Sequence, residues 1–162
     1  MYQLRGKLSI VMPAYNEEAL IYNSIMQTLS IVEQFAPDME IIAVNDGSKD
    51  KTKQEIERAI RDDAKQPHPV VPGMRVSGTR IKLVTSNKNR GKGNAIISGI
   101  SQAEGDYIAF VDADLELNPA QLEGYLKKMQ ESRSDVVIGC KFHKDSELHY
   151  PFVRKVISLA TI

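Results

Sequence analysis

The sequence has little cysteine, no excess of charge and no long apolar run, and each lack excludes a class of protein. Cys140 is the only cysteine among 162 residues, which excludes an internal disulfide and any metal site built from several cysteines. Lys and Arg total 21, as do Asp and Glu. A protein that coats nucleic acid needs a large excess of basic residues, so we expect no nucleic-acid partner. No stretch approaches the roughly 20 apolar residues of a membrane span, and the N-terminus has too short an apolar run for a signal peptide. The sequence is therefore expected to form one globular domain over residues 1–162, in a reducing compartment such as the cytoplasm.

Apolar segments of strand length alternate with segments of helical period. Strands are expected at residues 8–12, 40–45, 80–85, 107–111 and 135–139, and helices at 17–35, 50–64, 91–103, after Asn118, and from Pro151. Residues 66–79 hold three of the seven prolines, so a long loop is expected there. Strand 107–111 is almost continuously apolar and is expected to be buried on both faces. This alternation predicts an α/β fold, with a mostly parallel sheet flanked by helices on both faces.

Two aspartates follow the fourth expected strand, at the sheet edge where ligands of such folds bind. Asp112 and Asp114 are two residues apart, so on an extended chain their carboxylates point the same way, and Glu116 continues the period. Carboxylates at a strand end suit Mg²⁺ or Mn²⁺. They could instead be turn residues that start the next helix. Asn118 already fills the helix cap, however, and like charges repel without a cation, so the pattern favours a metal site.

Polar residues also follow the first two expected strands. At the first, Tyr15 could lie along a flat base and Glu17 could hydrogen-bond to it, although acidic residues also favour a helix start. At the second, Asp46 could accept hydrogen bonds from a base or ribose, but Asp-Gly also simply makes a turn. Neither segment is decisive by itself.

Residues 87–94, NKNRGKGN, place cations and glycines before the third expected helix. A helix start with backbone donors and cations is what a diphosphate needs. The segment lacks the third glycine of the dinucleotide fingerprint and is not a Walker motif, so a solvated basic loop remains an alternative. The three histidines have no metal-ligand spacing, and no nucleophile elbow is present.

Taken together, five segments resemble glycosyltransferase family 2, which has the Rossmann-like GT-A fold. They are SIVMPAYNEE, EIIAVNDGSKDKT, NRGKGNAIISGI, GDYIAFVDADLELNP and DVVIGCKFHKDS. The RGKGNA segment and the basic YPFVRK segment are similar to the branch that includes the dolichyl- and polyprenyl-phosphate mannose and glucose synthases. Members of the family continue well past this length, so the resemblance implies a domain that is incomplete at its C-terminus.

The resemblance implies which residues would serve each ligand. The sugar-nucleotide donor would be bound by Pro13, Ala14, Tyr15, Glu17, Asp46, Gly91, Lys92, Asp112 and Ala113. Asp112 and Asp114 would be catalytic and, with Glu116, would hold Mg²⁺ or Mn²⁺. Lys141 and Arg154 are candidates for the acceptor phosphate. Lys141 stands where this branch commonly has arginine, so it keeps the charge without the planar fork.

The implied function is an inverting, metal-dependent transfer of a hexose from GDP-mannose or UDP-glucose to a polyprenyl or dolichyl phosphate. The enzyme would work at the cytoplasmic face of a membrane. Two alternatives stay open within this resemblance: transfer to a saccharide hydroxyl, and a non-catalytic module that binds a nucleotide sugar. A sugar-phosphate nucleotidyltransferase has a related fold, but its glycine-rich N-terminal signature is absent, because the first strand here ends in PAYNEE.

Overall fold

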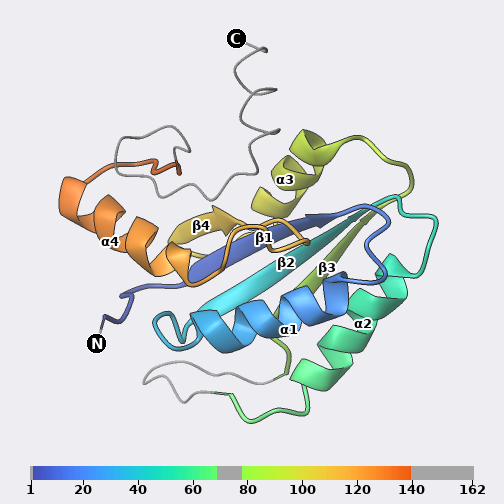
Figure 1. Ribbon diagram of the computed structural model, residues 1–162, viewed down its shortest axis with the longest axis horizontal. Helices are drawn as coiled ribbons and strands as arrows, with labels where there is room; N and C mark the ends of the chain where they lie inside the picture. Colours follow the sequence, from blue (N-terminus) through green and yellow to red (C-terminus); the bar gives the residue numbers. More distant parts are fainter. Residues whose placement is uncertain (1, 69–77, 140–162) are drawn as a thin grey trace, which may run out of the picture.

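The computed structural model describes residues 2–68 and 78–139 (Figure 1). Several features expected from the sequence lie outside the described residues. They are most of the loop at 66–79, Cys140, Lys141, Arg154 and the helix expected from Pro151. Within them, strands and helices alternate along the chain in the order β1 (Leu8–Ala14), α1 (Ile21–Val32), β2 (Met39–Asp46), α2 (Thr52–Asp63), β3 (Ile81–Ser86), α3 (Lys92–Ile100), β4 (Tyr107–Phe110) and α4 (Gln121–Ser132).

The four strands form one parallel sheet in the order β3-β2-β1-β4. Ile10 in the centre of β1 pairs with Ile41 on β2 and with Ala109 on β4. β1 and β2 are the inner strands, and nearly all of their residues are buried because helices cover both faces of the sheet there. The α/β fold and parallel sheet predicted from the sequence are confirmed.

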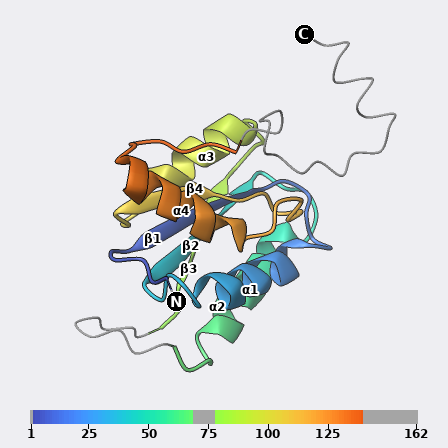
Figure 2. The same ribbon diagram turned by 60° about the vertical axis from the view of Figure 1, so that its left-hand side comes forward.

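Helices cover both faces of the sheet, as Figures 1 and 2 show. Leu8, Ile10 and Met12 point to one face, where they form the main core with the buried sides of α1, α2 and α4. Val11 points to the other face and packs in a smaller core with Ala95 of α3. Gly99 allows α3 to lie close to the sheet there, because a Cβ at this position would overlap the Val11 side chain.

Most element boundaries fall within a few residues of those expected from the sequence. α1 begins at Ile21 rather than near Glu17, because the Glu17 carbonyl accepts hydrogen bonds from the backbone N–H groups of Leu20 and Ile21 in a preceding turn. Within the described part of the chain, no helix has the length and apolar character needed to span a membrane.

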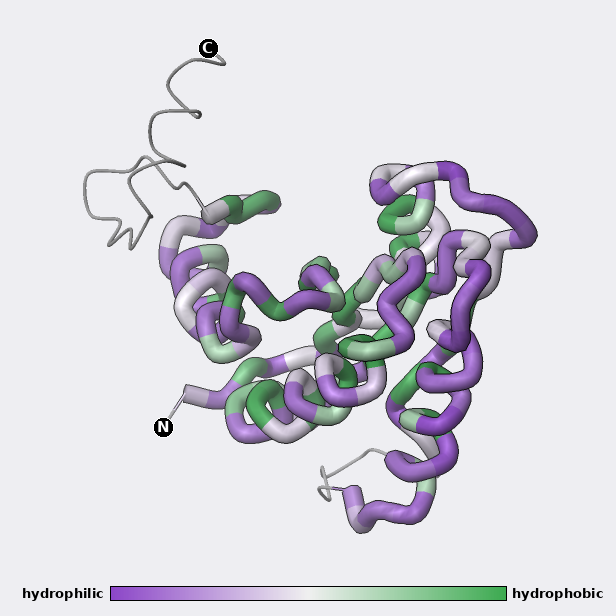
Figure 3. The backbone as a smooth tube through the Cα atoms, turned by 45° about the vertical axis from the view of Figure 1, so that its right-hand side comes forward, coloured by the Kyte–Doolittle hydropathy of each residue, from purple (hydrophilic) through white to green (hydrophobic). Residues whose placement is uncertain are grey.

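The prediction of a fifth strand at residues 135–139 is wrong. Residues 135–139 have no strand pairing, and Val136 and Ile138 are 73% and 77% exposed. In Figure 3 this segment is the hydrophobic stretch after α4. A short apolar run favours a strand only where a neighbouring strand pairs with it, and among the described residues none pairs with this segment.

The expected burial of β4 on both faces is wrong, because α3 does not cover one face of this strand. β4 is the edge strand of the described sheet, and Ile108 and Phe110 are 45% and 60% exposed. Both residues pair with positions on β1 that face α3, namely Ser9 and Val11. Ile108 and Phe110 therefore form an open face beside α3, whereas Tyr107 and Ala109 pack against the main core.

Candidate functional site

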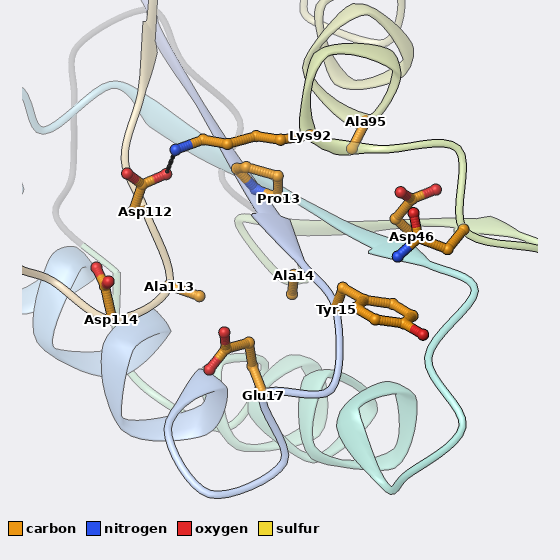
Figure 4. A pocket seen from close by; sticks show the side chains of 11 residues that line it. Pro13, Ala14, Tyr15, Glu17, Asp46, Lys92, Ala95, Asp112, Ala113 and Asp114 are labelled. Atoms are coloured by element: carbon orange, nitrogen blue, oxygen red, sulfur yellow. Dashed lines mark ion pairs between the residues drawn. The ribbon is translucent and has the colours of Figure 1, made fainter. Parts of the chain in front are cut away.

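A cavity of about 320 Å³ lies at the carboxyl ends of β1, β2 and β4, beside the start of α3 (Figure 4). This is the edge at which parallel α/β sheets bind ligands. Segments from widely separated parts of the sequence meet here, and the lining residues are Pro13, Ala14, Tyr15, Glu17, Asp46, Asn89, Lys92, Ala95, Asp112, Ala113 and Asp114.

The segment after β1 is fixed to the segment after β2 by hydrogen bonds. Asn16, with a left-handed φ of 57°, donates its backbone N–H to Ser48 Oγ at 3.0 Å, and its Oδ1 accepts the Lys49 N–H at 2.9 Å. The Glu17 N–H donates to Thr52 Oγ1 at 2.8 Å. These contacts hold Tyr15 and Glu17 on either side of the turn at the cavity wall.

Glu17 shares the cavity with other carboxylates, and its ionisation reflects this. Burial raises the pKa of Glu17 above its ordinary value, and the negative charges of Asp114 and Asp50 raise it further. Figure 4 shows the Glu17 and Asp114 side chains directed toward the same space. A cation held by Asp114 would offset the part of this pKa shift that comes from the charge of Asp114.

Asp46 at the end of β2 is buried, and its carboxylate anchors the loop before α3. Both of its oxygens lie 3.0 Å from the backbone nitrogen of Arg90, and Oδ2 also accepts a hydrogen bond from the Gly91 N–H at 2.8 Å. Gly91 itself does not line the cavity; it contributes through this bond and through its φ of +89°, which favours glycine. Gly47 permits the close approach, because a Cβ there would overlap the Lys88 backbone.

The segment after β4 carries the two aspartates expected to be catalytic. Ala113 between them is buried, and its carbonyl accepts a hydrogen bond from Ser24 of α1. Asp112 Oδ1 lies 2.6 Å from Lys92 Nζ. Asp114 Oδ1 accepts the backbone N–H of Glu116 at 3.1 Å. Ser24 thus fixes the backbone from which both carboxylates reach the cavity.

Two of the three residues predicted to bind the metal lie at this cavity. Asp112 and Asp114 both line the cavity, whereas Glu116 is not among the lining residues. Across residues 2–68 and 78–139, no group of three or more His, Cys, Asp or Glu side chains converges as a metal cage. Mg²⁺ and Mn²⁺ are commonly held by one or two carboxylates together with substrate phosphates, so a pair of aspartates is a sufficient protein donor set.

The sequence placed nearly all of the lining, and it missed two residues. Asn89 and Ala95 line the cavity without having been expected to. Asn89 lies inside the basic segment, but nothing in its residue type separated it from its neighbours. Ala95 is one turn into α3, where a small residue is typical of helix packing and gives no functional signal. The roles assigned to the lining residues stay predictions.

Comparisons with known proteins identify the family. The sequence profile described as Glycosyl transferase family 2 matches residues 9–156. The chain belongs to this family. Over 157 residues it is 31% identical to the undecaprenyl-phosphate 4-deoxy-4-formamido-L-arabinose transferase of Shewanella sediminis. The aligned part is 95% of this chain and 43% of that protein.

Solved glycosyltransferases share the fold. The mannosyltransferase PcManGT from Pyrobaculum calidifontis, solved with GDP-Man and Mn²⁺, aligns with a TM-score of 0.61 at 21% identity, over 78% of this chain and 33% of that one. Residues 1–349 of TarS from S. aureus, solved with UDP, align with a TM-score of 0.56 at 21% identity, over 86% and 40% of the two chains. This chain therefore spans less than half the length of the relatives that it matches.

Proposed function

We propose that this chain carries the donor-binding site of a glycosyltransferase that transfers a sugar from a nucleoside diphosphate to a polyprenyl phosphate. The observation that carries the proposal is the convergence of Asp112, Asp114 and Lys92 on one cavity at the carboxyl ends of the strands. The family membership supports a nucleotide-sugar donor, and the name of the Shewanella sediminis relative supports a polyprenyl-phosphate acceptor.

In this proposal, each part of the lining has its own task. Tyr15 offers a ring face to the base, and Glu17 accepts a hydrogen bond from the nucleoside. Asp112 and Asp114 would hold Mg²⁺ or Mn²⁺, which when bound neutralises negative charge on the departing diphosphate. Lys92 adds a second positive charge at the start of α3, where backbone N–H groups also favour an anion.

The acceptor proposed here needs little help from the protein to react. A lipid phosphate is already ionised at neutral pH, so its oxygen can attack the sugar carbon without a general base. The protein must then orient two anions and screen their repulsion. Lys141 and Arg154 remain our candidates to meet the acceptor phosphate, which would place the reaction at the cytoplasmic surface of a membrane.

The sugar and the base of the donor are the finer part of the proposal. We propose a hexose carried by GDP or UDP, as in GDP-mannose and UDP-glucose. The name of the Shewanella sediminis relative specifies a modified L-arabinose instead, which makes a 4-formamido pentose the competing donor sugar. Offering both kinds of donor to the protein distinguishes them.

The experiment measures transfer of a radiolabelled sugar to undecaprenyl phosphate in detergent, with Mn²⁺ and each donor in turn. We expect labelled lipid from one donor, and loss of at least about 100-fold in the Asp114→Asn variant, because the developing charge is no longer neutralised. Glu123→Gln on α4, outside the cavity lining, is the control and should retain the wild-type rate. Label that appears on a saccharide rather than on the lipid would overturn the proposed acceptor.

A further inference from the structure

The cavity is lined by more acidic than basic groups. Glu17, Asp46, Asp112 and Asp114 contribute carboxylates, and Lys92 is the one cationic side chain among the lining residues. The Asp46 carboxylate is committed to backbone N–H groups. The remaining three face the space that a nucleoside diphosphate, itself strongly anionic, would enter. Such a ligand needs positive charge at this place before it can bind.

Lys92 is held by the same carboxylate that the metal requires. Its Nζ lies 2.6 Å from Asp112 Oδ1. A divalent cation held by Asp112 would need the carboxylate that Lys92 already contacts, and would therefore lie close to the ammonium group. The two positive charges would repel each other, and Lys92 can relieve that repulsion by leaving Asp112.

Leaving costs little, because the pair is exposed to water. The side chains of Lys92 and Asp112 are 57% and 46% exposed, and exposed ion pairs contribute little to stability. Lys92 is also the first residue of α3, so its long flexible side chain can turn toward an anion at the helix start without disturbing the helix.

We propose that Lys92 and the divalent cation compete for Asp112, and that Lys92 transfers to the donor diphosphate when the metal–nucleotide complex binds. The inference rests on the proposed function and adds a specific role for one residue. Lys92 lowers the affinity for metal alone and raises the affinity for metal with nucleotide. The cavity is thereby tuned to take the two together.

The test measures Mn²⁺ binding from the electron paramagnetic resonance signal of unbound Mn²⁺, first without and then with UDP or GDP. Without nucleotide, Lys92→Gln should bind Mn²⁺ about tenfold more tightly than wild type, because the competing charge is gone. With nucleotide, the same variant should bind the diphosphate about tenfold more weakly. Lys92→Arg, which keeps the charge, should resemble wild type in the first measurement.

The matched control is Lys127→Gln on α4. Lys127 Nζ also lies 2.6 Å from a carboxylate, that of Glu123, but this pair is not part of the cavity lining. The Lys127→Gln variant should therefore bind Mn²⁺ and the nucleoside diphosphate with wild-type affinity.

Equal or weaker Mn²⁺ binding by Lys92→Gln without nucleotide, or no measurable Mn²⁺ binding by either protein, would overturn the inference. The proposed function fails differently: Lys92→Gln would still bind Mn²⁺ more tightly than wild type, but no nucleoside diphosphate would bind to either protein.

Discussion

At the residue scale, Asp46 makes a contact that its position in the sequence did not suggest. A carboxylate after the second strand was expected to hydrogen-bond the nucleoside. In the structure it accepts the N–H groups of Arg90 and Gly91, and so it joins the end of β2 to the loop before α3. The sequence placed Asp46 at the cavity but could not show this bond, because its partners lie 44 and 45 positions away.

Asp46→Ala should therefore loosen the loop before α3. The partly buried Arg90 N–H would lose its acceptor, whereas the Gly91 N–H would keep only Asn89 Oδ1. We expect a loss of about 1–3 kcal/mol in the free energy of unfolding. Amide hydrogen exchange at Arg90 and Gly91 should accelerate in the folded protein. Glu57→Ala on the exposed side of α2 is the control. Unchanged exchange at both amides would contradict the anchoring role.

At the scale of elements, Glu40 joins the amino ends of all four strands. Its Oε1 accepts hydrogen bonds from Ser9 of β1 at 2.6 Å and from the Glu104 N–H before β4 at 2.8 Å. Its Oε2 lies 2.9 Å from Lys82 Nζ of β3 and 3.3 Å from Lys7 Nζ before β1. Stabilising charges thus gather at the edge of the sheet opposite the cavity.

This network predicts how stability depends on pH. Burial alone would raise the pKa of Glu40, but the hydrogen bonds from Ser9, Lys82 and the Glu104 N–H, with the charge of Lys7, lower it to about 2. Because the folded pKa lies below the ordinary value of 4.5, the stabilisation is complete above about pH 5 and is lost as the pH falls toward 2.

Glu40→Gln should lower the free energy of unfolding by about 2–3 kcal/mol at pH 7. The difference from wild type should shrink as the pH falls from 5 toward 2, because protonation removes the same charge from the wild-type protein. Urea unfolding at several pH values measures this, with Glu123→Gln as the exposed control. A difference that stays constant with pH would contradict the assigned pKa.

The order of elements was predictable because each strand or helix carries its own apolar period. Residues 135–139 show where that reasoning ends. Their short apolar run resembles that of a strand, yet the segment is unpaired and Val136 and Ile138 are exposed. Strand formation depends on a partner elsewhere in the chain, and the local pattern contains no information about that partner.

At the scale of the whole molecule, the described fold buries one side of the sheet more completely than the other. α1, α2 and α4 enclose the main core, whereas α3 leaves Ile108 and Phe110 of β4 uncovered. Ile97 and Ile100 on α3 are also exposed. Apolar side chains from two elements thus contribute exposed hydrophobic surface on the less covered side of the sheet.

Phe110→Lys tests whether this surface is open to solvent. Because Phe110 is mostly exposed, we expect a change of less than about 1 kcal/mol in the free energy of unfolding, together with weaker binding of a hydrophobic dye such as ANS. Ile10→Lys in the enclosed part of the sheet is the contrasting variant and should prevent folding. A loss above about 3 kcal/mol for Phe110→Lys would show that this face is covered.

The candidate site was predictable at this scale because parallel strands end at one edge of the sheet. Polar segments following β1, β2 and β4 had to meet there, and the cavity contains all three. The division of labour was not predictable: Gly91 acts through its backbone, Glu116 lies outside the lining, and Lys92 pairs with Asp112. These details depend on side-chain geometry that spacing does not encode.

The proposed function requires that this cavity bind a nucleoside-diphosphate sugar through a divalent metal held by Asp112 and Asp114. Calorimetric titration with GDP-mannose and with UDP-glucose, each with Mn²⁺ and then with excess chelator, tests it most directly. We expect binding of one donor, which is lost with chelator and in the Asp114→Asn variant. Donor binding of equal strength with and without chelator, unchanged in Asp114→Asn, would contradict it.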